Sequence, residues 1–312
     1  MATVAETIGR PTRRRRRSGL SERRLAAAML SPSLIVIALV AAYPIGYAIW
    51  LSLNQYSVRV PGLKRWVGLD NYTAALSSSS FWSAVKVTFL FTVISVALEL
   101  VIGLAMALAM HESFRGRSVL RATVLVPWAV LTVGTAILWR SIFEPDLGFA
   151  NSVLKSLGLP GGHTVWLGQQ GYAFAVMVFA DVWKTAPFMA LLLLAGLQVI
   201  PEDVYEAARV DGATAWQRLT RITLPLLKPA ILVALIFRTL DALRIFDLPY
   251  VLTNGANGTT TLSLYAYNQL TQNRLIGPGS ALSVLTFIIV MAVSLIYIRF
   301  VGGNIRALAE EK

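Results

Sequence analysis

The sequence contains no cysteine and only two histidines, His111 and His163, which are far apart in the chain. Disulfide bonds and thiolate metal sites are therefore excluded, and no metal site is expected. Charged residues are also scarce, at 14 % of the 312 residues, while apolar residues make up 56 %. Such a chain is too apolar for a water-soluble domain of this length.

Two sequence patterns are missing as well. There is no phosphate-binding motif of the form G-x-x-x-x-G-K-[ST], so the chain has no nucleotide-hydrolysing site of that kind. No internal repeat of fixed period is apparent. We expect neither an enzyme active site nor a cofactor in this chain.

The apolar residues are clustered into runs long enough to cross a bilayer, which takes about twenty residues. The sequence therefore predicts an all-α integral membrane protein with a single membrane domain over residues 25–301, between a basic tail (1–24) and a short C-terminal tail (302–312). The six predicted spans are 25–53, 84–110, 118–141, 172–197, 228–250 and 280–301.

Arginine and lysine lie mainly on one side of these spans. They are concentrated in the N-terminal tail, which includes Arg10 and Arg13 to Arg17, and in the loops after the second and fourth spans. The positive-inside rule places both termini and the 206–225 segment in the cytoplasm. The net charge of +12 is then explained by topology and by anionic lipid rather than by nucleic acid. The first span is too long for a cleaved signal sequence and indicates an uncleaved anchor.

The polar segment 201–225 separates two of the predicted spans. Pro201 and the two acidic residues after it suit the first turn of a helix. Gly212 predicts a stop, because glycine adopts left-handed backbone angles without penalty. Thr214 can cap a second helix that ends before Pro225. Local physics alone predicts a helix–turn–helix outside the membrane, and an ordinary hairpin between spans explains it equally well.

The spacing within this segment resembles the EAA loop of binding-protein-dependent ABC importer permeases. Glu-Ala-Ala at 206–208 is followed at the expected distances by Gly212, Ile222 and Leu224-Pro225, although Leu219 replaces a frequent phenylalanine. The resemblance implies a coupling helix that docks on an ATPase subunit. The implied docking residues are Glu206, Ala207, Ala208, Asp211, Gly212 and Ala213.

The same resemblance implies the type I importer fold and an assembly in the plasma (inner) membrane. The implied partners are a second homologous permease, a pair of ATPase subunits that carry ATP and Mg²⁺, and an extracytoplasmic sugar-binding lipoprotein. Residues 236–267 further resemble the carbohydrate branch of the family, although Gly255-Ala256-Asn257 replaces the usual Gly-Gly-Pro. More narrowly, 181–189 and 237–242 resemble the first permease subunit of mycobacterial trehalose importers, which implies a disaccharide cargo.

Several charged residues interrupt the fourth and fifth predicted spans. Each costs about 2.5–3.5 kcal/mol at the centre of a membrane helix, so they are expected to pair or to line a wet cavity. At about 100° per residue, two groups each share one helix face, and both groups coincide with positions that line the sugar site in the maltose-type subunit that the chain resembles. The predicted substrate-binding residues are Asp181, Lys184, Thr185, Phe188, Arg238, Asp241, Ala242 and Ile245.

Other interpretations remain open at this point. The charges can instead be salt bridges that brace the bundle, which we favour for Arg244 and Asp247; Glu99 and Arg140 are expected to be packing or interface residues. The cargo can be another sugar or a glycerol phosphodiester. In a different class, a stand-alone transporter would use the intramembrane carboxylates as proton carriers.

Overall fold

The structure is a computed structural model that describes residues 22–60, 62, 64–112 and 115–310. Most of the predicted basic tail, with Arg10 and Arg13 to Arg17, lies outside the described residues. The chain divides into two compact units, Met1–Tyr47 and Ala48–Lys312.

The described part of the first unit is a run of helix. α1 (Glu22–Ile37) passes into a π-helical segment, η1 (Ala38–Ala42), and then into α2 (Tyr43–Ser52), whose last residues belong to the second unit. The wider π turn comes just before Pro44, where the ring would clash with the carbonyl four residues earlier in a regular helix. The whole helix Arg24–Ser52 is long and apolar enough to cross a membrane.

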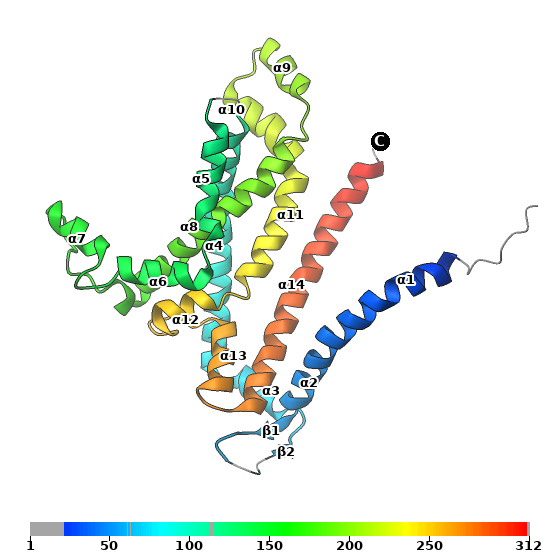
Figure 1. Cartoon of the computed structure of the whole chain (residues 1–312), viewed down its shortest axis with the longest axis vertical. Helices are drawn as coiled ribbons and strands as arrows, with labels where there is room; N and C mark the ends of the chain where they lie inside the picture. The colour runs from blue at the N-terminus through cyan, green and yellow to red at the C-terminus, as the bar shows by residue number, and fades with distance from the viewer. Residues whose placement is uncertain (1–21, 61, 63, 113–114, 311–312) are drawn as a thin grey trace, which may run out of the picture. The chain divides into compact units, whose positions relative to one another are not determined.

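The second unit contains four long helices joined by shorter ones. The long helices are α4 (Ser79–His111), α8 (Gln170–Leu197), α11 (Leu224–Ala242) and α14 (Ile276–Glu310). The shorter elements are α3 (Asp70–Ser77), α5 (Arg117–Ala129), α6 (Thr132–Ile142), α7 (Phe149–Ser156), η2 (Trp166–Gly168), α9 (Glu202–Val210), α10 (Ala215–Arg218), η3 (Leu219–Thr223), α12 (Asp247–Thr253) and α13 (Leu262–Thr271). Figure 1 shows α4, α8 and α11 packed together, with α9 and α10 beyond one end of them.

The core of this unit is the contact between α4 and α8, which α11 completes. The two helices approach closely at Gly103, where an added Cβ would lie 2.7 Å from Cγ of Met189. Met189, Leu193 and Leu197 follow one another on the same face of α8 and are fully buried. Apolar burial of this kind stabilises the helix contacts, and the absence of a side chain at Gly103 permits them.

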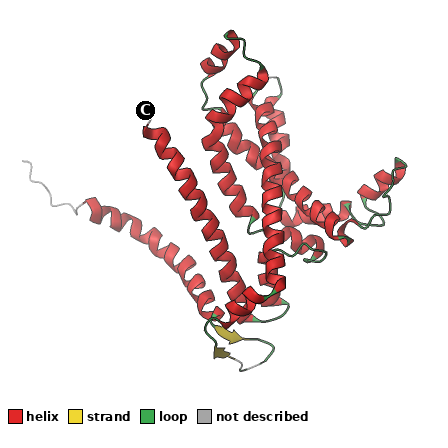
Figure 2. Ribbon diagram, turned by 180° about the vertical axis from the view of Figure 1, so that it is seen from behind, coloured by secondary structure: helices red, strands yellow, loops and turns green. Residues whose placement is uncertain are grey.

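A small antiparallel hairpin lies at the end of the second unit opposite α9 (Figure 2). Its strands are β1 (Asn54–Tyr56) and β2 (Lys64–Trp66). A bridge between Ser57 and Leu275 ties the hairpin to the segment that joins α13 to α14. We call this the hairpin end of the second unit.

Two of the predicted spans differ from the structure. The third is broken: α5 and α6 meet at a bend of 89°, because Val130 and Leu131 have extended backbone angles between them. The fifth is displaced toward the N-terminus, since one helix runs over Ala215–Ala242. The prediction that the helix capped by Thr214 ends before Pro225 is therefore wrong. A second π-helical turn, η3, precedes this proline, as one precedes Pro44, and lets the helix continue.

Candidate functional site

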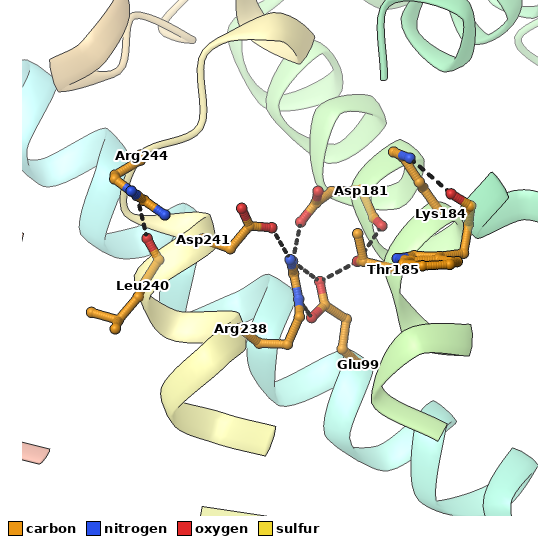
Figure 3. Close-up of polar contacts among 9 residues, drawn as sticks. Glu99, Asp181, Lys184, Thr185, Arg238, Leu240, Asp241 and Arg244 are labelled. Carbon is orange, nitrogen blue, oxygen red and sulfur yellow. Dashed lines mark hydrogen bonds and ion pairs between the residues drawn. The ribbon is translucent and has the colours of Figure 1, made fainter. Parts of the chain in front are cut away.

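An ion cluster centred on Arg238 joins the three packed helices of the second unit. Nε and Nη2 of Arg238, on α11, donate to the two carboxylate oxygens of Glu99, on α4, at 2.5 and 2.8 Å. Nη2 also lies 3.1 Å from Asp181, on α8, and Nη1 lies 2.5 Å from Asp241. The hydroxyl of Thr185 donates to Glu99 at 2.8 Å. Figure 3 shows these side chains converging from all three helices.

Glu99 is the residue of this cluster that the sequence analysis missed. It was expected to be a packing or interface residue, whereas it receives both arms of the guanidinium and is fully buried. A buried carboxylate requires such a paired, hydrogen-bonded countercharge. Glu99 therefore holds Arg238 in place, and through it the two aspartates.

Asp241 is the accessible edge of the cluster. Its side chain is 68 % exposed, compared with 10 % for Asp181 and 3 % for Arg238. Arg238 engages one of its oxygens, while the other has no hydrogen-bond partner in the part of the chain that the structure describes. A carboxylate fixed on one side and open on the other can accept hydrogen bonds from a polar ligand.

Lys184 and Phe188 lie on α8 beside the α5–α6 break rather than in the ion cluster. Nζ of Lys184 donates to the carbonyls of Val130 (2.6 Å) and Trp128 (3.3 Å). The ring of Phe188 stacks on that of Trp128, with centroids 5.6 Å apart. The last carbonyls of a helix lack intrahelical partners, so Lys184 satisfies the end of α5 where the span is interrupted.

This arrangement predicts a structural role for the Lys184 ammonium. In Lys184→Met two carbonyls lose their donor, and we expect the assembled protein to lose about 1–2 kcal/mol of stability. Lys184→Gln, which can still donate, should recover part of the loss. The measurement is the thermal unfolding midpoint in detergent. An unchanged midpoint in the methionine variant, combined with weaker cargo binding, would show that Lys184 contacts cargo instead.

The remaining predicted substrate residues pack inward. Ala242 is buried in the apolar cluster that contains Met177 and Val178, and Ile245 packs against the same cluster. Arg244 and Asp247, which we expected to brace the bundle, form no ion pair within the described residues. Because α11 ends at Ala242 and Asp247 begins α12, these two residues do not continue the helical face of Arg238.

The predicted coupling residues form the end of α9 and the turn after it. Gly212 has φ of +77°, the left-handed conformation that favours glycine. The amides of Asp211, Gly212 and Ala213 close this turn on carbonyls of the last turn of α9. On the far side of the turn, Thr214 forms a capping box with Gln217, which confirms the predicted cap.

The α9–α10 segment also exposes large apolar side chains outside the predicted docking set. Val210 is 88 % exposed and Trp216 is 71 % exposed, on either side of Gly212. Glu206 pairs loosely with Arg209 at 3.9 Å, whereas Ala208 is buried. Glu206 and Gly212 thus belong to a segment with exposed apolar side chains, and Figure 1 shows α9 and α10 of this segment beyond one end of α11.

Comparison with known proteins identifies close relatives along the whole length. The chain is 43 % identical over 303 residues to the trehalose transport system permease protein SugA of Mycobacterium tuberculosis, and the match covers 97 % of each protein. It is 46 % identical to the trehalose/maltose transport system permease protein MalF of Thermococcus litoralis, over 89 % of this chain and 94 % of that protein. The sulfoquinovosyl glycerol transport system permease protein SmoG of Agrobacterium fabrum is 39 % identical, over 90 % and 92 %.

The fold also matches a solved structure. A subunit of a bacterial ABC transporter involved in the import of the acidic polysaccharide alginate superposes with a TM-score of 0.77 at 26 % identity, over 89 % of this chain and 95 % of that one. The expected type I importer permease fold is thereby confirmed, with five long spans and the bent α5–α6 pair among the described residues. Residues 99–307 match the family described as binding-protein-dependent transport system inner membrane component. The chain belongs to this family, the permease subunits of ABC transporters.

Proposed function

We propose that this chain is one of two membrane subunits of an ABC importer that moves a neutral disaccharide, trehalose or a close relative, into the cytoplasm. The observation that carries this proposal is the open carboxylate of Asp241, held by a buried ion cluster at the junction of α4, α8 and α11. Adjacent hydroxyl pairs of a sugar donate to such a carboxylate. The names of the two relatives at 43 % and 46 % identity support trehalose.

The charge of the cluster favours neutral cargo. Three carboxylates (Glu99, Asp181 and Asp241) face one guanidinium (Arg238), so the formal charge is −3 + 1 = −2. A negatively charged cargo, such as a glycerol phosphodiester or a sulfonated sugar of the kind named for the 39 % relative, would be repelled there. Among the predicted substrate residues, we assign direct sugar contact to Asp241 and positioning to Asp181, Thr185 and Arg238.

The energy source in this proposal is a pair of partner ATPase subunits with ATP and Mg²⁺. The exposed turn at Gly212, with Val210 and Trp216 beside it, is the proposed docking surface. The arginine distribution favours a cytoplasmic location for this end of the protein and for both termini. A second permease and an extracytoplasmic sugar-binding lipoprotein complete the proposed assembly in the plasma membrane.

Reconstitution tests the proposal. The chain is combined in liposomes with a second permease, ATPase subunits and a binding protein whose genes neighbour its own. Uptake of labelled trehalose, maltose and a sulfonated sugar is then measured. We expect uptake of trehalose that requires ATP and is insensitive to a protonophore. Uptake by this chain without partners that collapses with a protonophore would establish a secondary transporter instead.

Asp241→Asn separates the binding role from the structural one. The change keeps the shape of the side chain and removes the charge at an exposed position, so the fold should be retained. Loss of one charge-assisted hydrogen bond is worth about 1.5–3 kcal/mol, which corresponds to roughly a 10- to 150-fold weaker apparent affinity for trehalose. The measurement is the concentration dependence of uptake. An unchanged affinity in a normally assembled variant would place the sugar site elsewhere.

A further inference from the structure

A pocket lies beyond the end of α11, beside the segment that carries Arg244. It has a volume of about 500 Å³ and is lined by the segment that follows α11, by α13 and by α14. Its size falls within the range of about 300–1,000 Å³ that small-molecule sites occupy. The lining residues that matter here are Arg244, Phe246, Tyr267, Ser283, Thr286 and Phe287.

Aromatic rings form one wall of this pocket. The ring of Phe246 stacks on Tyr250 at 5.3 Å between centroids and meets Tyr267 edge to face at 4.9 Å. Tyr250 and Tyr267 also contact each other, at 5.4 Å. Three rings that support one another hold the faces of Phe246 and Tyr267 in position, as required to cover the apolar C–H side of a sugar ring.

The polar groups of the pocket offer both donors and acceptors. Arg244 uses Nε to donate to the carbonyl of Leu240 at 3.2 Å, and its terminal nitrogens have no partner in the part of the chain described. The hydroxyls of Ser283 and Thr286 donate to carbonyls of their own helix, at 3.0 and 2.8 Å. Their hydrogens are thus committed while their oxygens can still accept. A ligand hydroxyl, which both donates and accepts, suits this combination.

Hydrocarbon is a poor occupant of the same space. Arg244 is exposed and lacks an ion pair among the described residues, and an unpaired guanidinium facing lipid tails is costly. It follows Asp241 by only three residues at the end of α11. The unpaired cation and the open carboxylate of Asp241 therefore mark two neighbouring polar sites.

We propose that this pocket is a second carbohydrate subsite, which takes one ring of a neutral, hydroxyl-rich ligand next to the Asp241 site. The proposal rests on the function proposed above and extends it. Sugar stacks on Phe246 and Tyr267, donates to Ser283 and Thr286, and accepts from Arg244. In this arrangement the cargo occupies the pocket before or after it binds at Asp241.

The absence of cysteine from the chain provides a direct test. In the assembled importer in nanodiscs, Ser283→Cys introduces the sole thiol of this subunit into the pocket, and its reaction with a small maleimide is followed on the separated subunit. Because an occupied pocket buries roughly 70–90 % of its ligand's surface, we expect saturating trehalose to slow labelling by at least about threefold. The matched control is Ser294→Cys, whose serine makes the same type of bond on α14 outside the pocket, and its labelling should not change.

Two further variants distinguish this site from the first. When Asp241→Asn is added to Ser283→Cys, trehalose should still protect the introduced thiol from labelling. When Arg244→Gln is added instead, the trehalose concentration that gives half of the maximal protection should rise about tenfold. Protection that disappears with Asp241→Asn would mean that sugar acts on the pocket only through the first site. An introduced thiol that fails to react even without sugar would mean that lipid or a partner's side chain fills the pocket. Either result overturns the second subsite.

The two proposals fail in different ways. Normal trehalose uptake by the unmodified importer, together with a Ser283→Cys thiol that trehalose does not protect, rejects the second subsite alone. An unmodified importer that takes up no sugar of the panel, with no protection of the introduced thiol by any of them, rejects the proposed function as well.

Discussion

Arg238→Met is expected to prevent normal accumulation of the protein in the membrane. The substitution keeps an unbranched but shorter side chain, and it leaves Glu99 fully buried, and Asp181 nearly so, without a countercharge. Removing one partner of a buried ion pair costs about 3–5 kcal/mol, a large share of the free energy of unfolding of a typical domain. The amount of detergent-extracted, monodisperse protein and its thermal unfolding midpoint report the effect.

A variant in which the carboxylates of Glu99 and Asp181 are also neutralised provides the control. Adding Glu99→Gln and Asp181→Asn to Arg238→Met should restore much of the accumulation, because neutral amides are far less costly to bury than charges. Transport is not expected to return, since Asp241 has lost its ion pair with Arg238. A single Arg238→Met variant with a normal yield and midpoint would disprove the bracing role of the cluster. Failure of the triple variant to improve on the single one would show that the guanidinium itself, rather than charge balance, is required.

Gly212→Val is expected to abolish cargo uptake while leaving the membrane protein assembled. Its φ of +77° is strained for valine, and no atom lies within 4 Å of an added Cβ. The cost to this chain alone is thus a local backbone strain of about 1–2 kcal/mol. At the proposed docking surface, however, we expect both the reshaped turn and the added side chain to interfere with the proposed ATPase partner. We expect ATP hydrolysis by the complex to continue without uptake.

Gly116→Val is the matched control for this variant. Gly116 also has a positive φ, of +94°, and also has open space around an added Cβ, but it precedes α5 rather than following α9. It carries a similar local strain of about 1–2 kcal/mol but lies outside the proposed docking surface, so uptake should remain within about twofold. Equal loss of uptake in both variants would point to general destabilisation. Normal uptake in Gly212→Val would rule out the coupling assignment.

Most of the membrane spans could be predicted from the sequence, because a run of about twenty apolar residues is a strong signal. The end of the fifth span could not. The segment from Leu243 to Phe246 contains no helix breaker, and apolar residues continue past it. The overlooked signals were Asp247 and Pro249, an acidic residue and a proline in the first turn of α12, which are typical of a new helix.

The ion cluster was predicted in part from the sequence. Asp181, Thr185, Arg238 and Asp241 do meet, since helical periodicity brings each pair to one face. The ion pair of Glu99 with Arg238 was not predicted, because Glu99 is the one acidic residue of its predicted span and has no charged neighbour in the sequence. It is the last of four buried polar residues on α4, after Thr88, Thr92 and Ser95, and that three- and four-residue spacing marks a polar stripe on a single face. The hydrogen-bond partners of Lys184 could not be predicted, because they are backbone carbonyls at a helix break, and its contact with cargo stays a prediction.

The helix that begins after Thr214 and ends at Ala242 connects the turn at Gly212 with the ion cluster. Ala215 and Asp241 belong to one continuous helix, and at 1.5 Å per residue they are separated by roughly 39 Å along it. The helix changes direction between α10 and α11 (Figure 1), but no loop interrupts it. The capped turn after Gly212 and the Asp241 carboxylate are therefore joined by one continuous helical segment.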